Sequence, residues 1–514
     1  MKILLAAVNA KYIHSNPAVY SLKAFAEKNG SPEITVREFT INEPRDKILA
    51  RIRDEHPDFL GLSVYIWNVT TVRSLIPEIR KLFPGVMIWL GGPEASCRAG
   101  EMLTDFPEVT GIVIGEGEKS FSELVCSLEK GQNDLSKIPG ILFRDESHVS
   151  DEGRKESHDR EEKTGLSEFV QTSPAVLTDL TEIPFLYDDL TPFKNRILYY
   201  ESGRGCPFRC AYCLSSIDKA LRFRNPETVK KELQFFLDNQ VKQVKFVDRT
   251  FNCKKEHAME IWRYLKEHDN GITNFHFELE AEILTDEEIE LITSMRPGQL
   301  RIEIGIQSTH KETLLAVNRE SDWKKLSSIV GRIIRAGNTI VHLDLIAGLP
   351  FEDYERFAQS FNDVYALYPD ELQLGFLKIL YGTPLAEKTE EFGMTCCSFP
   401  PYEILSTKWL SETDIRKLKQ IEYVLDLYYN SRQYVSVLPV LEPFFKNPFS
   451  LYESLASFFE ANHLFAVTPS RFERYESLLS FSRKHCPADA VTEIRRKLTQ
   501  DYNSREVKRN RRYF

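Results

Sequence analysis

Three things are scarce in this chain of 514 residues, and each scarcity excludes a class of protein. No apolar run approaches the roughly 18 residues of a membrane-spanning helix, so no membrane role is expected. Basic residues do not predominate, and a formal charge of -10 argues against a general nucleic-acid scaffold, although a local basic patch stays possible. Only nine cysteines occur, without paired spacing. This pattern agrees with a reducing compartment and predicts a cytoplasmic location.

The remaining composition is that of an ordinary globular protein, with 42% hydrophobic and 28% charged residues. A chain of this length is too long for one core. We expect a first domain over residues 1–140, a polar linker and strap over 141–194, a second domain over 195–395 and a helical domain over 396–514.

Three of the cysteines share one short segment, Arg204-Gly205-Cys206-Pro207-Phe208-Arg209-Cys210-Ala211-Tyr212-Cys213. Three thiolates can hold three corners of a 4Fe-4S cluster, which leaves one iron open to the amino and carboxylate groups of S-adenosylmethionine (SAM). Zinc sites usually present a second cysteine or histidine pair, and the sequence has none near by. The spacing favours the cluster.

This segment, including Tyr212 before its last cysteine, resembles the signature of the radical SAM superfamily. The resemblance implies that Cys206, Cys210 and Cys213 ligate the cluster and that Tyr212 lies at the cofactors. It also implies that the reduced cluster cleaves SAM to a 5'-deoxyadenosyl radical. We expect a reducing partner such as flavodoxin or ferredoxin.

The segment before residue 130 alternates apolar strands with amphipathic helices. Strands are expected at 3–8, 34–39, 59–65, 86–91 and 111–115, and helices at 18–28, 45–55, 71–83 and 120–130. This order predicts a doubly wound, Rossmann-like parallel sheet of the α/β class.

Polar and glycine-rich segments follow these strands, at the sheet edge where such folds bind ligands. They are 9–16, 63–68, Gly91-Gly92-Pro93-Glu94 and Gly115-Glu116-Gly117-Glu118. The glycines could simply form tight turns, or they could let the backbone approach a large planar ligand. Together with the cysteine segment, they resemble the cobalamin (B12)-binding domain of cobalamin-dependent radical enzymes, over residues 1 to about 400. The resemblance implies cobalamin contacts from Ser63, Tyr65, Gly91, Gly92, Pro93, Glu94, Gly115 and Glu116.

In the cobalamin-binding motif of mutases and methionine synthase, a histidine after the first strand ligates cobalt from below. Lys11 stands at that position here. A lysine is protonated at neutral pH and is a poor cobalt ligand, so we expect the lower face to lack this ligand. His14 is an alternative ligand or an ordinary loop residue.

Residues 146–165 are too polar to build a core and predict a solvated loop or hairpin tip. Ile183-Pro184-Phe185 and Leu190-Thr191-Pro192-Phe193 indicate an extended strap. Beyond it, strands are expected at 196–201, 243–248, 274–280, 300–305, 339–346 and 371–379, with helices between them. Six such units predict a partial (β/α)6 barrel, whose functional residues project from the carboxyl ends of its strands.

Glu280, Gln307, Arg319 and Asp344 lie at or after these strand ends. Their types and intervals resemble those of oxygen-independent coproporphyrinogen dehydrogenase and its relatives. The resemblance implies that Arg319 pairs with the SAM carboxylate and that the other three contact polar parts of SAM. Salt bridges at the barrel rim are the alternative. Asp248 and Asn252 also end a strand, as substrate-side groups or as turn residues.

The C-terminal region is helical and rich in aromatic residues, which indicates a bundle core or a cap over the substrate. Cys396 and Cys397 are adjacent and are expected to be inert, because neighbouring cysteines do not easily ligate one cluster. The tail contains Arg505, Lys508, Arg509, Arg511 and Arg512. It is expected to be solvated, with contact to phosphate groups as the alternative.

These patterns favour a cobalamin-dependent radical SAM enzyme that transfers a methyl group to a weakly reactive carbon. In the scheme that the resemblance implies, the 5'-deoxyadenosyl radical removes a substrate hydrogen, methylcobalamin supplies the methyl group, and a second SAM restores it. Rearrangement or ring closure is one alternative. A cofactor-sensing protein that binds RNA or a partner is another. A methylthiotransferase is disfavoured, because a second cysteine triad is missing. The substrate, a small molecule or a modified macromolecule, is not identified.

Overall fold

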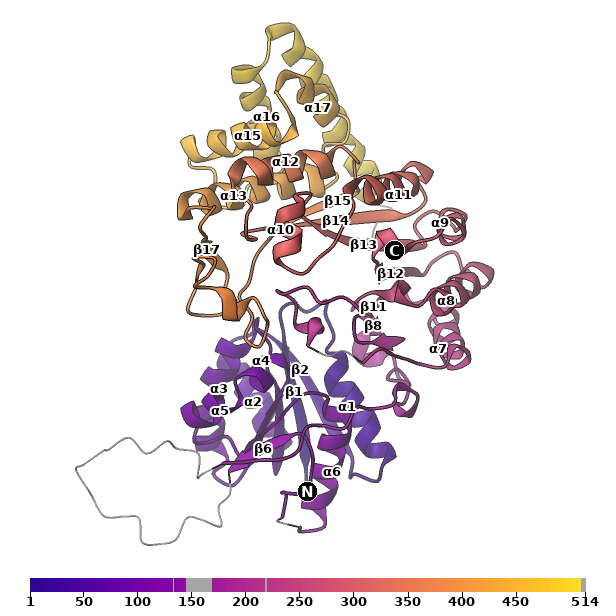
Figure 1. The fold of residues 1–514 in the computed structure, drawn as a ribbon, viewed down its shortest axis with the longest axis vertical. Helices are drawn as coiled ribbons and strands as arrows, with labels where there is room; N and C mark the ends of the chain where they lie inside the picture. Colours follow the sequence, from indigo (N-terminus) through magenta and orange to yellow (C-terminus); the bar gives the residue numbers. More distant parts are fainter. Residues whose placement is uncertain (133, 145–168, 218–219, 510–514) are drawn as a thin grey trace, which may run out of the picture.

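A computed structural model describes residues 1–132, 134–144, 169–217 and 220–509, with side chains up to residue 504. The chain forms three parts that follow one another along its long axis (Figure 1). The first sheet lies at one end, a second sheet lies in the middle, and the C-terminal helices lie at the far end. Within the described residues, no helix combines the length and apolarity needed to span a membrane.

The first sheet has seven strands in the order β2-β1-β3-β4-β5-β6-β7. Its parallel strands are β1 (Ile3–Asn9), β2 (Ile34–Thr40), β3 (Phe59–Ser63), β4 (Met87–Gly91) and β5 (Gly111–Val113). The helices are α1 (Pro17–Lys28), α2 (Arg45–Glu55), α3 (Val69–Leu82), α4 (Pro93–Cys97), α5 (Ala99–Asp105) and α6 (Gly117–Glu129). Apolar side chains of α1 and α6 pack into one core, and those of α2, α3 and α5 pack into another. The two cores confirm the doubly wound architecture.

Two antiparallel strands complete this sheet, β6 (Ile141–Arg144) and β7 (Phe169–Gln171). Ile141, Leu142 and Phe143 are buried, because β6 covers the edge that β5 would otherwise expose. The expectation that the linker begins at residue 141 is therefore wrong. The polar segment 146–165 lies outside the described residues.

The second sheet is fully parallel, in the order β15-β14-β13-β12-β11-β8. Its strands are β8 (Leu198–Tyr200), β11 (Gln243–Phe246), β12 (Asn274–Glu278), β13 (Leu300–Gln307), β14 (Ile340–Ala347) and β15 (Glu371–Phe376). The connecting helices are α7 (Pro226–Asp238), α8 (Lys255–Glu267), α9 (Asp286–Thr293), α10 (Lys311–Ala316), α11 (Trp323–Ala336) and α12 (Tyr354–Tyr365). Burial alternates strictly along β13, so apolar residues face the helices and polar residues face the lumen. The six strands confirm the partial barrel.

The short strands β9 (Gly203–Arg204) and β10 (Arg222–Phe223) pair antiparallel and flank the cysteine segment. After the barrel come a second short pair, β16 (Thr395–Cys396) and β17 (Ile404–Ser406), and five helices within the described residues. These helices are α13 (Glu412–Leu425), α14 (Leu438–Leu441), α15 (Pro448–Ala461), α16 (Arg471–His485) and α17 (Ala488–Arg509).

The C-terminal helices share one continuous apolar core with the barrel. Phe361 of α12 contacts Phe449 of α15 edge to face, with ring centroids 5.5 Å apart. Figure 1 shows α15, α16 and α17 beyond the barrel, on the side away from the first sheet. The aromatic residues thus form a core rather than a cap over the interdomain space. Residues 510–514 of the basic tail, and the side chains of 505–509, lie outside the described part.

The backbone at Gly92, between β4 and α4, has a conformation and surroundings that do not suit a side chain. Its φ is +106°, and a Cβ there would lie 2.6 Å from the carbonyl oxygen of Val64. Gly92→Ala should therefore lower the free energy of unfolding by about 1–3 kcal/mol, through backbone strain and this clash. Denaturant unfolding measures the loss. Gly85→Ala is the control, because a Cβ there would meet nothing within 4 Å, and an equal loss in both variants would contradict the prediction.

Candidate cobalamin and radical SAM site

A cavity of about 970 Å³ opens at the carboxyl edge of the first sheet, and Arg204 and Leu214, on either side of the three cysteines, line it from the second domain. Seven of the eight residues expected to contact cobalamin line it: Ser63, Tyr65, Gly91, Gly92, Pro93, Gly115 and Glu116. Cys97, Glu118, Tyr199 and Arg204, which the sequence did not single out, line it too. Residues from distant parts of the chain thus enclose one space.

The cavity continues as a slot between the first sheet and helices α1 and α6. Leu5, Gly61 and Trp89 line its sheet side, and Leu22 and Phe121 line its helix side. A Cβ on Gly61 would lie 2.6 Å from Leu5 Cδ2, so the backbone at this position leaves no room for a side chain. The slot suits a ligand with a broad planar head at the strand ends and a slender tail.

Glu94 is the exception among the expected contacts. Its buried carboxylate accepts a hydrogen bond from the Tyr402 hydroxyl and lies 3.7 Å from Arg98 Nη1. It does not line the cavity. The predicted contact of Glu94 with the cofactor stays a prediction, since Tyr402, 308 positions later, already donates to its carboxylate.

Glu116 lines the cavity, but its carboxylate is paired. Arg204 Nη1 lies 3.2 Å away, and Arg222 binds both carboxylate oxygens. Although burial opposes it, these two arginines hold the pKa of Glu116 below its ordinary value. The Glu116 carboxylate is thus bound by arginines of the second domain, and the backbone of its turn is the part that can contact a ligand.

Neither Lys11 nor His14 is among the described residues that line the cavity. Lys11 is exposed, and His14 Nδ1 lies 2.6 Å from the Tyr199 hydroxyl. Both positions thus lie apart from the described cavity lining.

The cysteine segment is anchored on both sides by backbone hydrogen bonds. The N–H of Ala211 donates to Val317 at 2.8 Å, and the carbonyl of Ala211 accepts from Leu385 at 2.9 Å. All three thiols are free, and Cys210 is buried. Three unpaired thiols on one braced loop are the donor set that a 4Fe-4S cluster with an open iron needs.

Cys253 lies near this loop, which the sequence did not indicate. Burial, followed by the neighbouring Cys206 and Asp248, raises the pKa of Cys253 to about 11. Cys396 and Cys397 are half-buried, and burial raises the pKa of Cys396.

Arg319 connects the cysteine loop to the barrel rim. Its Nη2 donates to Glu280 Oε2 at 2.7 Å and to the carbonyl of Gly305 at 2.6 Å, and its Nη1 lies 3.7 Å from Cys210 Sγ. Burial raises the pKa of Glu280, and the positive charge of Arg319 offsets part of that rise. Arg319 Nε has no hydrogen-bond partner among the described residues. The guanidinium keeps a donor for a further acceptor beside the cluster loop.

Gln307 stands at an irregularity where β13 pairs with β14, and its φ is +69°. Its side chain lies close to Gly305, where an added Cβ would collide with Gln307 Nε2. Gln307 Oε1 is buried, and no described residue donates a hydrogen bond to it. A buried acceptor without a donor in a strained backbone indicates a site for a polar ligand.

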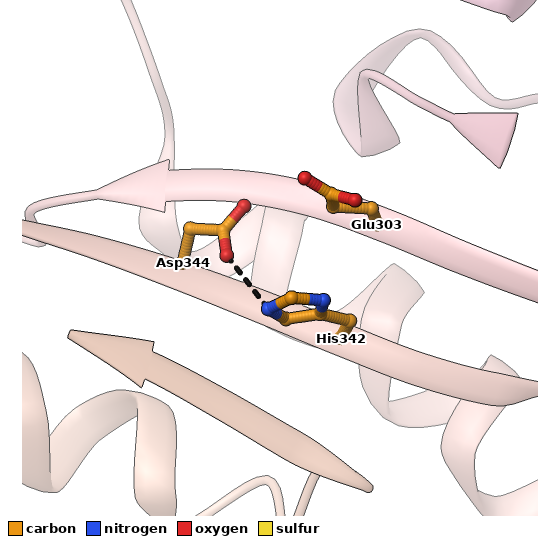
Figure 2. A group of neighbouring side chains, drawn as sticks. All are labelled: Glu303, His342 and Asp344. Carbon is orange, nitrogen blue, oxygen red and sulfur yellow. Dashed lines mark ion pairs between the residues drawn. The ribbon is translucent and has the colours of Figure 1, made fainter. Parts of the chain in front are cut away.

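Asp344 lies in a different group of side chains, shown in Figure 2. Its Oδ1 is 2.9 Å from His342 Nε2, and Glu303 of the neighbouring strand lies close to both. Lys245 Nζ and His276 Nε2 lie 3.0 and 3.1 Å from Glu303 Oε2. These are ligand types of a metal site, but Lys245 already supplies a positive charge to Glu303. The four expected SAM contacts thus divide, with Glu280, Gln307 and Arg319 around Gly305 and Asp344 in this lumen group.

Asp248 and Asn252 act as structural groups. Asp248 is buried and accepts hydrogen bonds from Ser202 N at 2.9 Å and Ser202 Oγ at 2.6 Å. Asn252 exchanges two hydrogen bonds with the backbone of Glu280, at 2.9 and 3.0 Å. Their side chains brace the loops that carry the cysteines and Glu280, which favours the turn interpretation.

Sequence comparison supplies the decisive observation. A B12 binding domain matches residues 3–125, and the Radical SAM superfamily matches residues 200–364. The chain thus carries the two domains of a cobalamin-dependent radical SAM enzyme. Their cofactors are a 4Fe-4S cluster, SAM and cobalamin, and the thiol triad, the unpartnered Gln307 oxygen and the glycine-lined slot fit these groups. A third family, described as a protein of unknown function (DUF4080), matches residues 390–514.

Two curated relatives are named as methyltransferases. The cobalamin-dependent radical SAM methyltransferase TokK of Streptomyces tokunonensis is 24% identical over 66% of this chain and 50% of its own length. The 2-(S-pantetheinyl)-carbapenam-3-carboxylate methyltransferase of Streptantibioticus cattleyicolor is 24% identical over 60% and 45%. The chain therefore spans about half the length of these relatives.

Solved structures show the same fold. The cobalamin-dependent SAM radical enzyme OxsB superimposes with a TM-score of 0.66 at 14% identity, over 100% of this chain and 81% of OxsB. The methyltransferase TsrM from Kitasatospora setae gives 0.60 at 17% identity, over 78% and 79%.

Because Asp248 is buried, we expect the difference in stability between Asp248→Asn and the wild type to depend on pH. Burial raises its pKa to about 7, against 3.8 for the free residue, although hydrogen bonds from Ser202 oppose the rise. Between these values the folded state binds more protons than the unfolded state, so this carboxyl lowers stability as pH rises from about 4 to 7. The melting temperature of Asp248→Asn, relative to the wild type, should therefore increase over this range and level off above it.

A constant offset is expected as well, because the amide cannot accept both hydrogen bonds from Ser202. Thermal melts at several pH values check the trend. Asp46→Asn, at an exposed position, is the control. A difference that stays flat with pH would contradict the prediction.

Proposed function

We propose that this enzyme transfers a methyl group from SAM to a weakly reactive carbon of its substrate. The observation that carries the proposal is the cavity at the glycine-rich edge of the first sheet, which Arg204 and Leu214 on either side of the three cysteines also line. When bound, the cluster with SAM supplies a carbon radical that abstracts hydrogen, and cobalamin supplies the methyl group. Two relatives are named as methyltransferases, which supports the methyl outcome.

In this proposal, Arg319 binds the carboxylate of SAM. Its guanidinium already lies beside Cys210 and has an unpartnered Nε, and a fork of donors suits a carboxylate. Glu280 holds Arg319 in place and presents its remaining oxygen to the ligand. Gln307 Oε1 accepts a hydrogen bond from a donor group of SAM. Asp344 is kept as a contact to SAM or to the substrate from the lumen side.

The first sheet holds cobalamin at its strand ends. Gly91, Gly92 and Gly115 bring backbone close to the flat macrocycle, and Ser63 and Tyr65 offer hydroxyl groups. The slot beneath them takes the tail and excludes water from it. The substrate lies between the two sheets. Reduction by a flavodoxin or ferredoxin in the cytoplasm belongs to the same proposal.

Ring closure is the second candidate. An anaerobic magnesium-protoporphyrin IX monomethyl ester cyclase of Rubrivivax gelatinosus is 20% identical over 66% of this chain and 59% of its own length. The products of SAM separate the two candidates. Methyl transfer converts one SAM to S-adenosylhomocysteine and another to 5'-deoxyadenosine, whereas a cyclase releases no S-adenosylhomocysteine.

The test uses protein reconstituted anaerobically with iron, sulfide and cobalamin. It is incubated with a reductant, SAM labelled with ¹³C in its methyl group, and a metabolite extract. Both nucleoside products and one labelled metabolite are expected. Deoxyadenosine without S-adenosylhomocysteine would favour ring closure. Failure to form deoxyadenosine, or its persistence after Cys206, Cys210 and Cys213 are changed to alanine, would overturn the proposal.

Arg319→Ala should weaken SAM binding while the cluster stays in place. Loss of a buried charged partner costs about 2–4 kcal/mol, or roughly 30- to 1000-fold in affinity. Equilibrium dialysis of the reconstituted protein measures the affinity, and iron and sulfide assays check the cluster. Arg332→Ala is the matched control, because Arg332 pairs with Asp286 on the exposed surface. An unchanged SAM affinity in Arg319→Ala would contradict the assignment.

A further inference from the structure

One guanidinium, that of Arg204, holds three carboxylates from two domains. Its Nε and Nη2 donate to Glu201 at 2.9 and 2.8 Å, Nη2 also donates to Glu118 at 2.8 Å, and Nη1 lies 3.2 Å from Glu116. Only 19% of the Arg204 side chain and 7% of the Glu118 side chain are exposed. Buried charges of this kind depend on one another, because removal of one leaves the others unpaired.

On the barrel side, Arg204 is directly connected to the cluster loop. Arg204 lies opposite Arg222 in the backbone pairing of the two-stranded β9–β10 ribbon, and the Arg222 side chain also donates to Glu116. Gly205 follows with a φ of +96°, and a Cβ there would lie 2.5 Å from the carbonyl oxygen of Ala220. The next residue is Cys206. The backbone from Arg204 to the first cluster ligand is therefore tightly constrained.

On the other side, Glu116 precedes α6 and Glu118 lies in its first turn. Both line the cavity that we assign to cobalamin, as do Gly115 before them and Gly117 between them. The turn is itself fixed, because Thr178 N donates to Glu116 at 3.1 Å and Ser21 Oγ donates to Glu118 at 3.0 Å. One side chain thus joins the rim of the cobalamin cavity to the base of the cluster loop.

We propose that Arg204 is a positioning residue that sets the distance and orientation of the cluster relative to the corrin ring. The inference rests on the proposed cofactor binding, and it adds which residue keeps the two cofactors at a fixed spacing and orientation. An arginine suits this role because its planar fork reaches three carboxylates at once, which a lysine cannot do. Hydrogen abstraction and methyl transfer at one substrate carbon need both cofactors at set distances from it, so a fixed spacing has a direct chemical use.

The experiment measures magnetic interaction between the two cofactors. The holoenzyme is prepared with a reduced cluster and cob(II)alamin, without SAM, and the microwave-power saturation of the cob(II)alamin EPR signal is recorded. A nearby reduced cluster speeds the relaxation of this signal, and the effect falls steeply with distance. The wild type should show the enhancement. Arg204→Gln should lose most of it with unchanged iron and corrinoid content, and Arg204→Lys should retain an intermediate part.

Arg196→Gln is the matched control. Arg196 Nη1 pairs with Glu38 across the same two domains at 2.5 Å, both side chains are largely buried, and neither residue lines the cavity. Its enhancement should equal that of the wild type. Glu118→Gln removes one arm of the network and should give a smaller loss, which keeps the test decisive if Arg204→Gln does not fold.

The outcomes separate the two proposals. A wild-type protein that takes up no cluster or no corrinoid contradicts the proposed function. Wild-type relaxation in fully loaded Arg204→Gln, or in Glu118→Gln where the first variant does not fold, overturns the positioning role. An equal loss in Arg196→Gln also overturns it, because any interdomain ion pair would then have the same effect.

Discussion

Parallel strands all end at the same edge of their sheet, and this constraint organises the whole molecule. The first sheet and the barrel turn those edges toward one shared space. Beyond the strand ends the backbone leaves the hydrogen-bonded ladder of the sheet, so loops and ligands meet there. The cysteine loop comes from one edge and the glycine-rich turns come from the other. The two segments that we assign to the cofactors are thereby brought to facing sides of the molecule.

Charge keeps the two edges together. The guanidinium groups of Arg204 and Arg222 bind the carboxylates of Glu116 and Glu118. Arg196 forms an ion pair with Glu38, and the Tyr402 hydroxyl donates a hydrogen bond to Glu94. Each contact joins residues that are far apart in sequence, and each is largely buried. Pairs of this kind add little net stability, but they penalise any arrangement that separates them. They specify how the domains face one another.

Much of the fold could be predicted because the signals are local. Continuous apolar runs and helical periodicity indicated all eleven parallel strands, and three cysteines on one loop indicated the cluster. Strands β6 and β7 were missed because they are short and flank a polar segment. The partners of Glu94 and Glu116 were missed, because turn composition does not reveal a partner 308 or 106 residues away. Asp344 shares a strand face with His342, and only the side-chain geometry shows that it turns toward that neighbour.

The shared core of the barrel and the C-terminal helices has a consequence for the architecture of the chain. Tyr365 of α12 donates to Glu442 at 2.6 Å and lies 3.2 Å from the Tyr452 hydroxyl, while Phe361 packs on Phe449. The segment after residue 410 is thus a wall of the catalytic barrel rather than a detachable module. A chain shortened before α13 would turn these aromatic rings toward water. Evolutionary exchange of this segment would require simultaneous change on α12.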